Sequence, residues 1–162
     1  MLEAMNRSEI TEQIVAARLA KGLSWQELAD AINRPVVWTT SALLGQQPIP
    51  AELGEILVGL LELDRSAVPV LAAVPMRGGS AAREAPADPT IYRLYEALGV
   101  YGPAIKELIH EQFGDGIMSA INFSMDLERK PHPGGDRVVI TFDGKFLPYE
   151  WNSADRVPDD GC

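Results

Sequence analysis

Three residues in the second half of the chain have types and spacing that could do chemistry, and two of them form a pair. Arg93 and Glu96 are three residues apart in a segment of helical periodicity, so their side chains meet on one face of a helix. An arginine recognises oxyanions through its planar guanidinium, which stays charged at any working pH. The same spacing is also typical of a solvated surface salt bridge, and spacing alone does not decide between the two interpretations.

The third residue, Ser119, lies in a run that alternates with a period of two, which is typical of a strand. It is the only hydroxyl on a face whose other members are apolar: Ile117, Ile121, Phe123, Met125 and Leu127. A hydroxyl in such a position either bonds to backbone groups or serves something that binds there, and both interpretations stay open. The chain contains no Gly-x-Ser-x-Gly elbow, phosphate-cradling glycine loop or dinucleotide fingerprint.

Metal chemistry has little support in the sequence. His110 flanks an apolar helical stripe and has no second ligand at metal spacing, whereas a metal site needs several convergent donors. The single cysteine, Cys162, can form no intramolecular disulfide, and it lies in a polar tail. We therefore expect an inert Cys162 and no metal ligand at His110.

Charge and composition restrict the classes of partner that the chain can bind. The chain has 162 residues, 46% of them hydrophobic, which is enough for a real core in one domain or two small ones. Its formal net charge of −9 repels phosphate backbones and anionic lipid headgroups, and no basic patch offsets this. The N-terminus lacks the pattern of a signal peptide, and no apolar run approaches membrane-spanning length. We expect a cytoplasmic protein that binds neither nucleic acid nor membranes.

The elements before residue 75 are predicted to be helical. Helical spacing and stop signals predict helices over 8–21, 24–33, 35–44, 51–61 and 65–73. Ser24 and Glu27 match a capping box, while Gly22 and Gly45 end the helices before them. Pro35 suits the first position of the third helix.

Two of these short helices flank the turn 32–34, and this arrangement resembles the helix-turn-helix domains of phage-repressor type. Such a domain raises the alternative of a transcriptional regulator whose C-terminal part senses a small anion. The third helix, however, carries Val, Trp, Thr, Ser and Ala where a DNA reader needs Arg, Lys, Asn or Gln. Residues 1–75 hold five Lys or Arg against nine acids, a balance of −4 that argues against DNA binding.

The remaining chain is predicted to be α+β. Proline and glycine mark a linker over 76–87; a helix then begins at Pro89 and runs to about Tyr101. Gly102 and Pro103 are expected to separate it from a second helix over 105–113. Strands are predicted over 117–128, 138–142 and 145–147, with a loop at 131–135 and a hairpin turn at Asp143-Gly144. We expect domains over 1–75 and 88–151 and a mobile acidic tail over 152–162.

Four segments resemble the cyanase family, also called cyanate hydratase or cyanate lyase, both in their sequences and in their order along the chain. They read WTTSALLGQQ at 38–47, DPTIYRLYE at 88–96, GDGIMSAINF at 114–123 and DGKFLP at 143–148. The resemblance covers nearly the whole chain, and the tail after Tyr149 is longer than the usual ending of the family.

The resemblance implies a lyase that breaks cyanate down with bicarbonate as co-substrate, giving carbamate and carbon dioxide, and then ammonia. Such a reaction removes a toxic anion and supplies nitrogen. The catalytic Arg, Glu and Ser of the family correspond to Arg93, Glu96 and Ser119. Also implied are a helix-turn-helix-like domain that does not read DNA, an intertwined C-terminal dimer, a decamer built from five such dimers, and active sites between subunits. No metal or organic cofactor is implied, because bicarbonate supplies the nucleophile.

The role of Glu96 stays open between orienting an arginine and moving a proton. Besides the regulator, a catalytically silent oligomeric scaffold is a third alternative.

Overall fold

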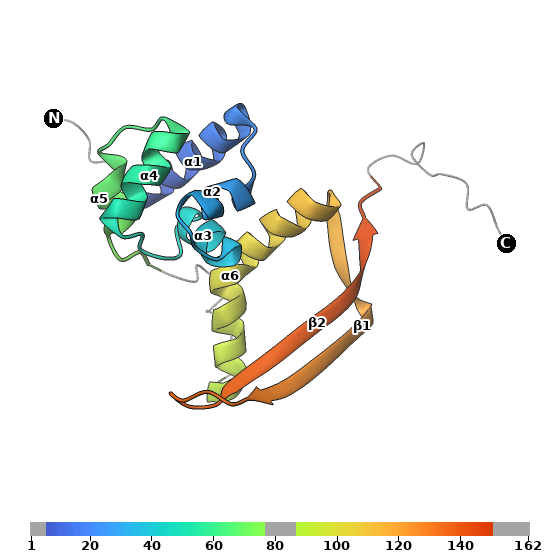
Figure 1. The fold of residues 1–162 in the computed structure, drawn as a ribbon. Coiled ribbons are helices and arrows are strands. Elements are labelled where there is room, and N and C mark those ends of the chain that lie inside the picture. Colours follow the sequence, from blue (N-terminus) through green and yellow to red (C-terminus); the bar gives the residue numbers. More distant parts are fainter. Residues whose placement is uncertain (1–5, 77–86, 151–162) are drawn as a thin grey trace. The chain divides into compact units, whose positions relative to one another are not determined.

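The computed structural model describes residues 6–76 and 87–150 (Figure 1). Its elements, in chain order, are α1 (Arg7–Lys21), α2 (Trp25–Ala31), α3 (Val36–Leu43), α4 (Ala51–Leu61), α5 (Ala67–Ala72), α6 (Pro89–Phe113), β1 (Gly116–Lys130) and β2 (Arg137–Pro148). The predicted α+β class is confirmed. The chain forms two compact units, Met1–Leu108 and Ile109–Cys162, which divide within α6.

Local signals fix the first two helices. Asn6 caps α1, and its side chain and that of Glu9 bond to each other's backbone N–H groups. Gly22 ends the helix in the left-handed conformation, at φ 64°. The capping box of α2 is present as predicted: the backbone N–H of Ser24 donates to Glu27 at 2.7 Å, and that of Glu27 donates to the Ser24 hydroxyl at 3.1 Å. These bonds lower the pKa of Glu27.

The core of the first unit is made by the apolar faces of its helices. The largest fully buried side chains in it are Ile10, Ile14, Trp25, Leu28, Leu43, Ile49, Leu57, Leu61 and Leu71. They come from every helix between α1 and α5 and from the segment before α4. Each such side chain contributes roughly 1.5–3 kcal/mol when it leaves water, so this cluster is the main source of stability of the unit.

Arg7 joins three segments of the first unit through backbone carbonyls. Its Nη1 donates to the carbonyl oxygens of Val70 and Leu71, both at 2.8 Å. Its Nη2 donates to Ala42 at 2.9 Å and to Gln47 at 2.7 Å. Partial burial lowers the pKa of this guanidinium through desolvation. Arg7 therefore holds the start of α1 to the C-terminal ends of α3 and α5.

Helix α3 packs against the other helices of the first unit, as its composition predicts. Thr39, Thr40, Ser41, Ala42 and Leu43 are all buried, so most of the helix is unavailable to a partner. Two boundaries differ slightly from the prediction: Pro35 is the N-cap instead of the first helical residue, and the helix ends at Leu43. The turn before it includes Asn33 in the left-handed region, at φ 48°.

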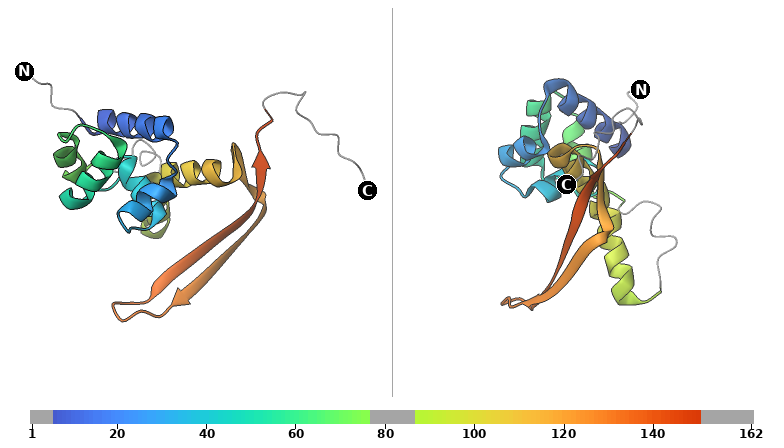
Figure 2. Two further views of the ribbon diagram at one scale, coloured as in Figure 1. Left: turned by 45° about the horizontal axis from the view of Figure 1, so that its top comes forward. Right: turned by 90° about the vertical axis from the view of Figure 1, so that its right-hand side faces the viewer.

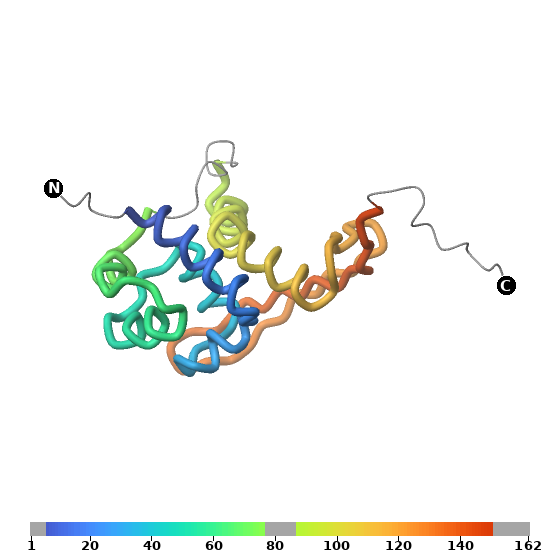
Figure 3. Tube along the Cα trace, turned by 90° about the horizontal axis from the view of Figure 1, so that it is seen from above, coloured from blue at the N-terminus to red at the C-terminus, as the bar shows by residue number. Residues whose placement is uncertain are grey.

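The predicted break at Gly102-Pro103 is wrong. Helix α6 is continuous from Pro89 to Phe113 and contains Pro103 in its interior. Figures 1 and 3 show a continuous helix that changes direction along its length. A proline removes one helical hydrogen bond and clashes with the preceding turn, which bends a helix when other contacts hold both sides. One such contact is the buried Ser41 hydroxyl, which donates to the Val100 carbonyl at 3.2 Å.

The predicted hairpin turn at Asp143-Gly144 is also wrong. β1 and β2 form one long antiparallel hairpin, and both residues lie inside β2, paired with Ser124 and Phe123. Figure 2 shows the two strands side by side and twisted about each other. The chain reverses instead in the segment 131–136, which contains the predicted loop. A glycine inside a strand often marks a bulge or a close backbone approach, and the site below shows both.

Contacts of His110 tie the end of α6 to the start of β1. Nε2 of His110 lies 3.2 Å from the carbonyl oxygen of Gly116, and Nδ1 lies 3.5 Å from Oδ1 of Asp115. The backbone N–H of Tyr149 donates to the Asp115 carbonyl at 2.9 Å. Among residues 6–76 and 87–150, no three His, Cys, Asp or Glu side chains gather as a metal site requires.

Several predictions concern parts of the chain outside the described residues. These are the linker, apart from its ends at Met76 and Ala87, the tail over 152–162 with Cys162, and the first five residues. The predicted domain boundaries stay predictions. Among the helices that are described, none is long and apolar enough to cross a membrane.

Candidate active site

The Arg93–Glu96 pair lies near the start of α6. Asp88 caps this helix, since its Oδ1 accepts hydrogen bonds from the backbone N–H groups of Thr90 at 3.0 Å and Ile91 at 2.9 Å. One turn later, Nη1 of Arg93 donates to Oε2 of Glu96 at 2.6 Å. The predicted meeting of the two side chains on one helix face is confirmed.

Both members of this pair are open to solvent within a single chain. The Arg93 side chain is 72% exposed and that of Glu96 is 47% exposed. The hydrogen bond from Arg93 to Glu96, with the attraction of the opposite charges, raises the pKa of the guanidinium. Arg93 therefore stays cationic, and its other nitrogen donors are available to an anion.

An exposed apolar stripe accompanies the pair on α6. The residues predicted to share one face are each about half exposed in the single chain: Ile91, Leu94, Tyr95 and Leu98. A stripe of this size on a helix is unusual for a monomer and typical of a surface that another chain covers. The charged pair lies on the opposite face of α6, so the helix carries both this pair and a surface suited to assembly.

Ser119 occupies a bulge in β1. Met118 pairs with Phe146 and Phe123 pairs with Gly144, so four residues of β1 lie opposite the single residue Lys145 of β2. β1 therefore carries three extra residues, an odd number, which interrupts the predicted alternation. The prediction that Ser119 shares one face with Ile117, Ile121, Phe123, Met125 and Leu127 is wrong for this reason.

The bulge folds back onto the Ser119 hydroxyl. Its oxygen accepts hydrogen bonds from the backbone N–H groups of Ile121 at 3.1 Å and Asn122 at 3.0 Å. Ser119 is only 6% exposed, whereas Ile121 is 98% exposed. Of the two interpretations left open by the sequence, the bonds to backbone groups are therefore present. Because the hydroxyl oxygen is used as an acceptor, the hydroxyl can still act as a donor through its own proton.

The structure thus brings Arg93 and Glu96 together and places Ser119 in the other compact unit. Gly144 is a residue that sequence reasoning missed, because Asp-Gly between apolar runs is typical of a hairpin turn. The signal that could have found it is a glycine within a strand pattern, which indicates a bulge or a close backbone approach.

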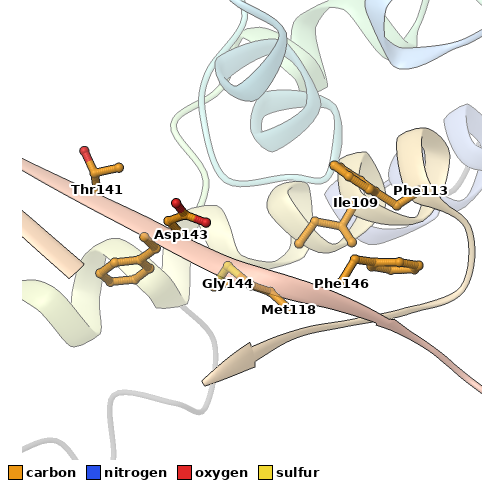
Figure 4. A pocket seen from close by; sticks show the side chains of 8 residues that line it. Ile109, Phe113, Met118, Thr141, Asp143, Gly144 and Phe146 are labelled. Carbon is orange, nitrogen blue, oxygen red and sulfur yellow. The ribbon is translucent and has the colours of Figure 1, made fainter. Parts of the chain in front are cut away.

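A cavity lies beside the bulge in the second unit. It has a volume of about 440 Å³ and is lined by Ile109, Phe113, Met118, Thr141, Phe142, Asp143, Gly144 and Phe146. Figure 4 shows Ile109, Phe113 and Phe146 together on one side, with the oxygen atoms of Thr141 and Asp143 on the other. Apart from those oxygens its side chains are apolar, so it suits an apolar group better than a compact anion.

Comparisons with known proteins agree over the length of the chain. Residues 7–75 match the family model "Cyanate hydratase, N-terminal", and residues 83–151 match "Cyanate lyase C-terminal domain". A cyanate hydratase of Mycobacterium avium (strain 104) is 74% identical over 96% of this chain and 100% of its own length.

Two further proteins are similar to this chain at lower identity. A cyanate hydratase of Methylibium petroleiphilum is 51% identical over 90% of this chain and 99% of its own. The crystal structure of a cyanase from T. urticae is 36% identical, covers 86% of this chain and 97% of its own, and has a TM-score of 0.42. With both family models matched and identities up to 74% over nearly the full length, the chain belongs to the cyanate hydratase (cyanate lyase) family.

Proposed function

We propose that the chain is a cyanate hydratase, a lyase that decomposes cyanate with bicarbonate as its co-substrate. The observation that carries this function is the 74% identity, over 96% of the chain, to a relative named as that enzyme. The relatives bear the name of an enzyme and not of a DNA-binding regulator, so the regulator alternative is not favoured. The burial of α3 supports the same choice.

Electrostatics explains why an arginine is needed. Cyanate and bicarbonate are both anions, and two like charges about 4 Å apart repel by roughly 4 kcal/mol at an effective dielectric constant near 20. A cation must offset this repulsion before the two can react. Arg93 is suited to the task because Glu96 holds it cationic and engages only Nη1.

The proposed reaction has two bond changes. An oxygen of bicarbonate attacks the cyanate carbon, which forms a C–O bond and a dianion. Two protons reach the cyanate nitrogen, one from the bicarbonate hydroxyl and one from solution, and the C–O bond on the bicarbonate side then breaks to release carbon dioxide and carbamate. One cyanate, one bicarbonate and one proton are consumed. Carbamate takes up a further proton and falls apart to ammonia and carbon dioxide.

Each residue of the proposed site has a role that its chemistry allows. Arg93 binds the dianion through its fork of N–H donors. Ser119 donates a hydrogen bond to the same anion, which fits a hydroxyl whose oxygen already accepts two backbone bonds. Glu96 orients Arg93 and is the candidate for moving the proton to nitrogen.

We propose that the site is completed by assembly. One chain supplies a single Arg93 and a single Ser119, in different compact units, and this is a thin donor set for two anions. Pooling copies at a symmetric interface multiplies the donors. The exposed stripe of α6 and the exposed apolar residues of the hairpin support a homo-oligomer, because an isolated two-stranded hairpin is at best marginally stable in water. The proposed assembly is a decamer built from five dimers, with active sites between subunits.

No metal or organic cofactor takes part in this scheme, because bicarbonate is itself the nucleophile. The proposed location is the cytoplasm, and a chain with one cysteine suits a reducing compartment.

The experiment is to measure ammonia release from cyanate with and without added bicarbonate, in buffer freed of dissolved carbon dioxide. The proposal predicts release that rises with bicarbonate and saturates with both anions. Two results would contradict it: no release at any bicarbonate concentration from assembled protein, or the same rate without bicarbonate.

A further inference from the structure

We propose that Gly144 is a positioning residue for Ser119, and that only a residue without a side chain can serve there. The inference rests on the role proposed above for Ser119. A Cβ built on Gly144 would lie 2.4 Å from the carbonyl oxygen of Ser119 and 2.5 Å from Cγ of Met118. Cβ atoms in proteins do not come closer than about 3.0 Å to such atoms, so a side chain at residue 144 forces a shift.

The nature of the closest atom decides what must move. A flexible side chain such as that of Met118 can rotate away at small cost. The Ser119 carbonyl is backbone, so it can move only if the bulge itself moves. Gly144 is required here for space and not for a left-handed conformation, since its φ lies outside that region.

A moved bulge changes the hydrogen bonds on the Ser119 hydroxyl. The Ser119 carbonyl is followed within three residues by the N–H groups of Ile121 and Asn122, which hold the hydroxyl oxygen at 3.1 and 3.0 Å. These two bonds occupy the oxygen as an acceptor and so fix the direction in which the proton is donated. A Cβ at residue 144 therefore disturbs the donor that Ser119 offers to the anion, although it never touches the anion itself.

A second glycine provides a matched control in the same hairpin. A Cβ on Gly116 would lie 2.4 Å from the carbonyl oxygen of Leu147 and 2.6 Å from the ring of Phe146. The crowding is as severe as at Gly144, and it also involves a backbone carbonyl. None of these atoms belongs to Ser119 or to its hydrogen bonds.

The test is a double-mutant cycle read in kcat and KM. Gly144→Ala is expected to lower kcat about tenfold or more, a loss within the range measured for coupled neighbours. In a Ser119→Ala background the same change is expected to cost less than about twofold, because the donor that it disturbs is already absent. Gly116→Ala should lower kcat by the same factor in the wild-type and in the Ser119→Ala background. Equal losses from Gly144→Ala in both backgrounds would overturn the proposal.

Hydrogen exchange gives a readout that does not depend on activity. Exchange of the Ile121 and Asn122 amides should speed up in Gly144→Ala and in Ser119→Ala, and stay at the wild-type rate in Gly116→Ala. If Gly144→Ala chains do not assemble alone, isotope-labelled copies co-refolded with an excess of wild-type chains allow the same measurement. Wild-type exchange rates in Gly144→Ala would overturn the proposal.

These readouts also separate the two proposals. If Ser119→Ala kept full activity, the proposed catalytic role of Ser119 would fail. The exchange rates of Ile121 and Asn122 would still show whether Gly144 positions the hydroxyl.

Discussion

Nη1 of Arg93 lies 2.6 Å from Oε2 of Glu96, on the solvent-exposed side of α6. The pair has the geometry of an ordinary surface salt bridge, and such pairs contribute little to stability. If the Arg93–Glu96 pair is only a surface contact, conservative substitutions in it should change neither activity nor stability. If Arg93 binds an anion, these substitutions should lower activity and leave stability unchanged.

The first prediction is that Arg93→Lys loses most activity while assembly and the unfolding midpoint stay as in the wild type. A lysine keeps the charge, but a point ammonium cannot reproduce the paired N–H donors of a guanidinium. The measurement is kcat/KM for cyanate at saturating bicarbonate, together with size and urea unfolding.

The control is Arg65→Lys. Arg65 bonds to Glu55 at 2.9 Å in a similarly exposed ion pair within the first unit. This variant should keep full activity. Near-normal turnover by an assembled Arg93→Lys protein would remove Arg93 from the proposed mechanism.

The second prediction concerns stability and not catalysis. Arg7→Met should destabilise the first unit by roughly 3 kcal/mol, because hydrogen bonds from a charged donor are lost at four carbonyls of partly buried backbone. The measurement is urea unfolding followed by far-ultraviolet circular dichroism. Arg65→Met, which removes an exposed guanidinium, is the control and should unfold close to the wild-type midpoint. Equal midpoints for the two variants would contradict the role given to Arg7.

The helices of the first unit could be predicted because their signals are local. The Ser24–Glu27 capping box and Gly22 act within one turn of the helix ends that they define. Two of the wrong predictions, at Gly102-Pro103 and Asp143-Gly144, have a common cause. In both places a strong local breaker is overruled by contacts from elsewhere in the chain: the buried Ser41 hydroxyl bonds to Val100, and the β1 bulge packs on Gly144.

The candidate site also has one part that the sequence predicts and one part that it does not. The Arg93–Glu96 contact follows from helical spacing, so the sequence predicts it. The bulge at Ser119 depends on a residue 25 positions later, Gly144, and on the register of the two strands. Alternation along β1 alone cannot reveal it, because the extra residues become visible only when the partner strand is aligned.

The third prediction tests whether the hairpin mediates assembly. Ile121→Asp should lower the oligomer size, because it places a charge on a side chain that is 98% exposed in one chain and proposed to be covered in the assembly. The measurement is light scattering coupled to size exclusion. Leu19→Asp, on an exposed apolar residue of α1, is the matched control and should leave the size unchanged. A wild-type oligomer formed by Ile121→Asp would contradict the proposed interface.

We propose that Arg93 and Ser119, from different compact units, act in one site to which different chains contribute. The most direct test is complementation between Arg93→Ala and Ser119→Ala chains, unfolded and refolded together. A site that lies wholly within one chain cannot be restored in this mixture, because every chain lacks one essential residue. A shared site can be restored wherever intact copies of the two residues meet.

The measurement is ammonia release from cyanate and bicarbonate by the mixed oligomers, over a range of mixing ratios, with each variant refolded alone as the control. Each control is expected to keep only a low residual activity, and the activity of the mixture is expected to rise well above that of both controls. The recovered fraction would also report how many copies of Arg93 a site uses. Mixed oligomers of confirmed size that are as inactive as their parents at every ratio would contradict the shared site.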